Sequence, residues 1–82
     1  MMTAQRLTYI FEYRRSTGEL HVEEFNDDYA AINRRFELED QHRGDDDTEV
    51  AMLIAEDLDI IKRTHSRYFG GRDDFDLVSH VK

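Results

Sequence analysis

Residues 44–59 read GDDDTEVAMLIAEDLD, with three aspartates, a run of apolar residues and three more acids after the run. One interpretation is a single amphipathic helix over 48–69, because the apolar residues recur at about 100° per residue. Two residues disagree with it. Met52 would face the solvent, and Asp57 would lie in the middle of the apolar face.

A strand followed by a helix removes both disagreements. A strand over 48–55 that is buried on both faces accounts for the continuous apolar run. Asp57 then caps a helix over 57–69, which the glycines at 70 and 71 end. We therefore predict strand and then helix, and keep the single helix as the alternative.

Upstream, residues 6–25 predict a β-hairpin. LTYIFEYR and LHVEEF both alternate between apolar and polar residues, as half-buried strands do. RSTGE lies between them, and Gly18 can adopt the positive φ of a tight turn.

The next segment predicts a helix over 27–43. Asn26 or Asp27 can cap its start, and Gly44 is a natural stop. One helix face is apolar, because it carries Tyr29, Ile32 and Phe36.

The tail over 74–81 alternates again and fits either a fourth strand or a terminal arm. The order β-β-α-β-α, with a C-terminal β if the tail pairs, predicts one α+β domain over 1–82. We expect a two-layer sandwich, with both helices on one face of a mainly antiparallel sheet. Such a sheet has an open face and often dimerises. The expected dimer face consists of Tyr9, Ile10, Phe11, Tyr13 and His21.

The composition limits the function. Charged residues make up 37% of the chain and the net charge is −8, which argues against nucleic-acid and anionic-membrane binding. There is no cysteine, so disulfides and thiolate metal sites are excluded. The N-terminus lacks a signal-peptide pattern, and no apolar run approaches the ~18 residues of a membrane span. These features predict a cytoplasmic protein.

Motifs for metal or catalytic chemistry are lacking. An EF-hand count from Asp45 puts Val50 where the loop needs glycine, and Leu53 where it needs a ligand. The histidines form no H-x-x-x-H pair. We predict no catalytic residue, no metal and no cofactor, and expect that the protein is not an enzyme.

The sequence KRTHSRYFGGR, residues 62–72, is basic and contains aromatic residues. It could contact an acidic partner or stack on single-stranded nucleic acid. The alternative is a structural role for the segment, because the core needs the ring of either Tyr68 or Phe69. The candidate interaction residues are Lys62, Arg63, His65, Arg67, Tyr68, Phe69 and Arg72.

The hairpin, the RRFELE of the first helix and the apolar strand followed by RTHSRYF resemble short proteins carried on mobile elements, such as integron gene cassettes. The resemblance spans about residues 9–69. It implies a small cytoplasmic bacterial accessory protein and supplies no catalytic residues.

The leading hypothesis is a non-enzymatic protein-interaction module that acts as a homodimer. One alternative is a small-ligand-binding or metal-dependent enzyme. The other is an acidic mimic of nucleic acid that inhibits a basic partner, through an anionic stripe of Asp45, Asp46, Asp47, Glu56, Asp57 and Asp59.

Overall fold

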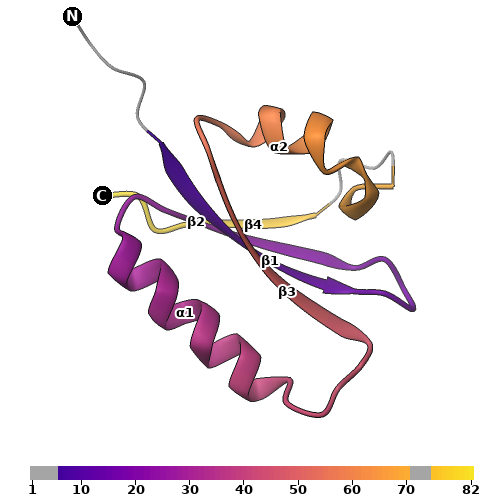
Figure 1. Ribbon diagram of the computed structural model, residues 1–82. Helices are drawn as coiled ribbons and strands as arrows, with labels where there is room; N and C mark the ends of the chain where they lie inside the picture. Colours follow the sequence, from indigo (N-terminus) through magenta and orange to yellow (C-terminus); the bar gives the residue numbers. More distant parts are fainter. Residues whose placement is uncertain (1–5, 71–74) are drawn as a thin grey trace, which may run out of the picture.

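The computed structural model describes residues 6–70 and 75–82. Its elements follow the predicted order, with a short 3-10 turn before the last strand (Figure 1). The predicted α+β class is confirmed. The elements are β1 Leu7–Arg14, β2 Leu20–Phe25, α1 Asp28–Gln41, β3 Thr48–Ala55, α2 Leu58–Thr64, η1 Ser66–Tyr68 and β4 Asp76–Ser79.

The four strands form one mixed sheet in the order β3-β1-β2-β4. β1 is antiparallel to both β2 and β3, whereas β4 runs parallel to β2. Gly18 has a φ of 77° in the turn between β1 and β2, a conformation that glycine adopts without steric cost. The tail is therefore a strand, and β3 and β4 are the two edges of the sheet.

The two helices lie on opposite faces of the sheet (Figure 1). Tyr9 and Phe11 of β1 share one core cluster with Ile61 of α2. Ile10, between them, shares a second cluster with Leu38 of α1. Successive side chains of a strand point to opposite faces, so each helix covers a different face. The expected two-layer sandwich with both helices on one face is therefore wrong. Both faces of the sheet carry buried apolar side chains of β1, and a different helix covers each face.

The expected dimer face is wrong for the same reason. Tyr9, Ile10 and Phe11 are each at most 1% exposed, because the helices of the same chain cover them. Tyr13 and His21 are partly buried. None of these side chains is a free anchor for a second protein.

Residues 44–59 form an acidic loop followed by the predicted strand and the predicted helix cap. β3 pairs with β1 along its whole length. The carboxylate of Asp57 then accepts a hydrogen bond from the Ile60 N–H at 3.0 Å, which caps α2. The single helix over 48–69 is therefore wrong.

Replacing Asp57 by alanine is expected to lower the free energy of unfolding by about 1 kcal/mol, since the Ile60 N–H loses its acceptor. Chemical denaturation measures this loss. Asp57→Asn keeps a capping oxygen and is expected to retain most of the stability. Equal losses in the two variants would contradict a capping role.

The second helix is shorter than predicted. α2 ends at Thr64, and the chain turns at His65, with φ −129° and ψ 50°, into η1. Neighbouring residues on an α-helix point about 100° apart, so a continuous helix would leave one of Tyr68 and Phe69 outside. The 3-10 turn allows both rings to be buried, and it leaves His65 exposed rather than on an inward helix face.

The first helix is capped by Asp27, which accepts from the backbone N–H of Tyr29 at 3.0 Å. Its buried side consists of Ala31 and Leu38. The apolar side that the sequence pattern indicates points away from the sheet instead. On that side the exposed fractions are 82% for Tyr29, 37% for Ile32 and 61% for Phe36.

Candidate interaction surface

Three apolar side chains lie along the outer side of α1. Tyr29, Ile32 and Phe36 are three and four residues apart, so they form one stripe along the helix. Arg34 lies on the other side of the helix, where its Nε donates to Glu23 of β2 at 2.9 Å. The stripe therefore points outward from α1, on the side of the helix away from β2 and toward β3.

The stripe continues onto β3. Ile54 is 59% exposed, although it lies on a strand. Ile54 and Tyr29 line an open depression of about 630 Å³, together with Arg6 and Thr8. We name this patch the α1–β3 surface; it consists of Tyr29, Ile32, Phe36 and Ile54.

The outer edge of β3 is unpaired within the described residues. Proteins usually protect such edges with lysine, proline, bulges or very short strands. β3 has eight residues in unbroken register with β1, and residues 50–55 carry neither a charge nor a proline. The α1–β3 surface thus adjoins a row of backbone N–H and C=O groups that can take another strand.

The predicted segment 62–72 is mostly committed to the protein's own core. Tyr68 and Phe69 are buried, and both rings meet Phe11 edge-on, at centroid distances of 5.1 and 5.7 Å. The Lys62 ammonium lies 5.2 Å from the centre of the Phe75 ring. These side chains hold η1 and the tail against the sheet.

The other predicted residues of segment 62–72 that the structure describes are either hydrogen-bonded to β3 or exposed. Arg67 donates a hydrogen bond to Glu49 of β3. Arg63 and His65 are exposed, and His65 Nδ1 lies 2.8 Å from the Thr64 hydroxyl. Arg72 lies outside the described residues. Among the six predicted residues that the structure describes, only Arg63 and His65 lie at the surface without a role in the core or at Glu49.

Glu49 of β3 binds the start of η1. Arg67 Nη2 donates to its carboxylate at 2.5 Å and the Tyr68 hydroxyl donates to the same oxygen. The Arg67 hydrogen bond is the main reason that the pKa of Glu49 lies below its usual value. Burial, and then the hydrogen bond to Glu49, raise the pKa of Tyr68 to about 12. This cluster links β3 to η1.

A second carboxylate, Glu23 of β2, is 4% exposed. It accepts from Arg34 at 2.9 Å and from the Nε2 atoms of His21 at 3.0 Å and His80 at 2.9 Å. Because an ionised carboxylate only accepts, each Nε2 carries the proton. Burial alone would raise the pKa of Glu23, but the hydrogen bonds from Arg34 and both histidines outweigh it and lower the pKa. This cluster joins α1 and the segment that follows β4 to β2.

The sequence pattern did not identify the Glu23 cluster. Its four residues come from β2, α1 and the tail, up to 59 positions apart (80 minus 21). The one local signal is the alternation of His21 and Glu23 on a strand, which puts both on the same face. Arg34 and His80 come from distant elements, so no local sequence pattern indicates that they bind Glu23.

Several acids of the 44–59 stretch have structural partners, among them Asp45 and Asp47. Asp47 accepts from the Ser16 N–H at 2.9 Å and lies 3.7 Å from Arg14. Asp45 accepts from the Asp47 N–H and the Thr48 hydroxyl, both at 2.9 Å. Among residues 6–70 and 75–82, no group of three or more His, Cys, Asp or Glu side chains is arranged to hold a metal ion.

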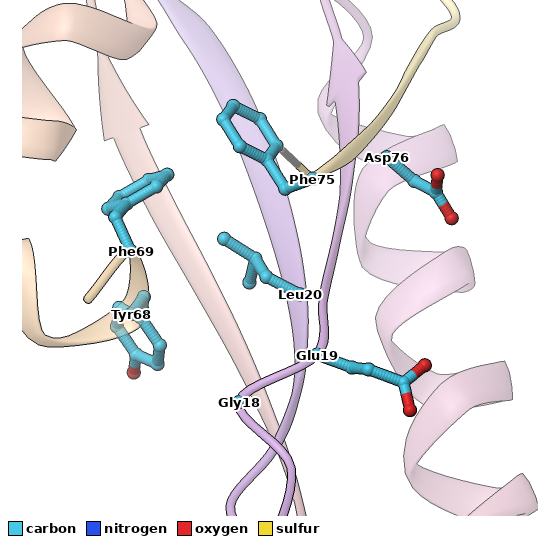
Figure 2. A pocket seen from close by; sticks show the side chains of 7 residues that line it. All are labelled: Gly18, Glu19, Leu20, Tyr68, Phe69, Phe75 and Asp76. Atoms are coloured by element: carbon cyan, nitrogen blue, oxygen red, sulfur yellow. The ribbon is translucent and has the colours of Figure 1, made fainter. Parts of the chain in front are cut away.

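A hollow of about 220 Å³ lies beside the β1–β2 turn. Figure 2 shows the side chains that line it. The rings of Phe69 and Phe75 lie above Leu20, and the carboxylates of Glu19 and Asp76 point away from the rings. Ligand sites usually exceed about 300 Å³. The hollow is therefore too small to identify a ligand site by itself.

No protein family, curated protein or solved structure matches the chain. In the part of the chain that the structure describes, no helix has the length and apolar character needed to cross a membrane. Function is therefore inferred from the arrangement of the side chains alone.

Proposed function

We propose that this chain is a non-enzymatic protein-interaction module that binds through the α1–β3 surface. The observation that carries the proposal is the exposure of Tyr29, Ile32 and Phe36 in one stripe on α1. Ala31 and Leu38 of the same helix are buried against the sheet, whereas these three side chains remain exposed. Exposed apolar patches commonly mark interaction sites, and aromatic side chains are enriched among interface anchors.

The alternatives have less support. Asp45, Asp47 and Asp57 are hydrogen-bonded within the loop or at the helix cap, which does not favour a free anionic stripe. Glu23 and Glu49 are saturated by their own neighbours, which does not favour a poised acid or base. A cytoplasmic bacterial accessory protein, as the resemblance to integron cassette products implies, is part of this proposal.

A photocrosslinking amino acid in place of Phe36, introduced in the native host, tests the proposal. We expect it to capture a discrete protein, because Phe36 is 61% exposed in the α1–β3 surface. The same probe at Arg63 is the matched comparison, since Arg63 is exposed in the predicted basic segment. Gel mobility and mass spectrometry identify the product. No product at Phe36, or equal products at both positions, would contradict the assignment of this surface.

A further inference from the structure

The α1–β3 surface is suited to bind its own copy. We propose that its partner is a second copy of this chain, joined by antiparallel pairing of the two β3 edges. The inference rests on the proposed function, since it names the partner of the same surface. The result is a closed dimer with a two-fold axis, in which each chain contributes the same patch.

The symmetry limits how the two β3 strands can pair. A two-fold axis normal to the sheet keeps every side chain on its own face of the sheet. Even-numbered residues therefore oppose even-numbered residues of the copy, and odd-numbered residues oppose odd-numbered ones. The uncharged stretch over 50–55 is centred next to Met52. An axis at Met52 places Val50 opposite Ile54 of the copy, and Glu49 opposite Ala55. No like charges face each other along the paired strands.

The helix is centred on the same axis. Asp28, at the start of α1, accepts from the Thr8 hydroxyl at 3.3 Å, and His42, just after its end, is hydrogen-bonded to Glu12. Both anchors lie on β1, two residues to either side of the residue that pairs with Met52. The middle of α1 is therefore level with the proposed axis.

This geometry brings the two helices together. With the axis at Met52, α1 and its copy run antiparallel on the same face of the joined sheet. Their stripes face each other across the axis, and Ile32 of one chain comes close to Phe36 of the other. One interface thus covers both the unpaired edge of β3 and the exposed apolar stripe of α1. For this reason we infer that the partner is a second copy of the chain.

The charge around the stripe is also compatible with self-association. Arg35 Nε lies 3.4 Å from the Glu39 carboxylate. This ion pair beside Ile32 therefore has no net charge. The chain as a whole carries −8, and the one acid within β3, Glu49, is paired with Arg67. Because salt screens that remaining repulsion, added salt is expected to strengthen the dimer.

Sedimentation of the full chain over a concentration series tests the pairing. We expect a dimer for the wild type and a roughly 30-fold or greater loss of affinity for Ile54→Lys and for Phe36→Glu, the size of an interface hot spot. Both side chains are exposed, so the monomer fold tolerates the changes. Leu77→Lys, at the opposite edge of the sheet, is the matched control and is expected to leave the affinity unchanged.

A cysteine variant tests the register without disturbing the surface. The chain has no cysteine, so Met52→Cys introduces a single thiol next to the proposed axis. Directly opposed residues have Cβ atoms about 4.5–5.5 Å apart, and a small shift allows a disulfide. We expect mild oxidation to give a covalent dimer for Met52→Cys and none for Leu77→Cys.

Three results would overturn the inference: a wild type that stays monomeric, a dimer that resists both surface substitutions, or a Met52→Cys variant that does not crosslink. The proposed function fails separately. A monomeric chain whose Phe36 probe captures a different protein overturns the dimer and retains the interaction module, whereas a Phe36 probe that captures nothing overturns both.

Discussion

Replacing Phe11 by alanine is expected to lower the free energy of unfolding by about 3–5 kcal/mol. Phe11 is fully buried at the centre of the sheet, and its ring contacts Tyr68 and Phe69 edge-on. A chain of this length has a total stability of roughly 4–12 kcal/mol. The substitution therefore removes a large part of it, and denaturation in urea measures the loss.

The matched control is the same substitution at Phe36, which is 61% exposed. Phe36→Ala is expected to change the stability by less than about 0.5 kcal/mol, because little apolar area leaves the core. Both variants are compared in an Ile54→Lys background, so that association does not contribute. Similar losses at the two positions would contradict the assignment of Phe11 to the core and Phe36 to the surface.

The local elements of the fold could be predicted from the sequence because their signals are local. Alternation identifies β1 and β2, and Gly18 marks their turn. Asp57 lies between an apolar run and a helical pattern, and it is the cap that separates them. Each of these signals involves residues only a few positions apart.

The arrangement of the helices could not be predicted, because it depends on contacts between distant polar residues. Thr8, Ile10 and Glu12 give β1 a mixed face that resembles an open one. In the structure, Thr8 binds the start of α1 and Glu12 binds His42 after its end, so this face is covered. Those two anchors, with the Arg34–Glu23 bond, orient α1 by its polar residues.

The candidate interaction surface in the structure differs from the predicted one because long-range contacts determine it. The helical spacing of Tyr29, Ile32 and Phe36 identifies an apolar face, but not whether that face meets the core. Conversely, Tyr68 and Phe69 lie in a basic segment that resembles a binding surface, although both rings are buried. Periodicity shows which side chains lie together, whereas long-range contacts decide which side is covered.

Replacing Glu23 by alanine is expected to cost about 2–3 kcal/mol of stability, the cost of losing hydrogen bonds to a charged group. Its carboxylate is the common acceptor for Arg34, His21 and His80, and without it their N–H groups lose their partner. Urea denaturation at neutral pH measures the change. Glu56→Ala is the control, because Glu56 is exposed and is expected to have little effect.

The contribution of Glu23 also depends on pH in a defined direction. Its pKa in the folded protein lies below the ordinary value of 4.5, so the folded state favours the ionised form. The stabilisation is therefore fully present above about pH 4.5 and is lost as the pH falls through the folded pKa. Glu23→Gln cannot ionise, so the difference in unfolding free energy between wild type and variant is expected to shrink on acidification. A difference that stays constant, or grows, between neutral pH and pH values well below 4.5 would mean that the folded protein does not favour the charged carboxylate.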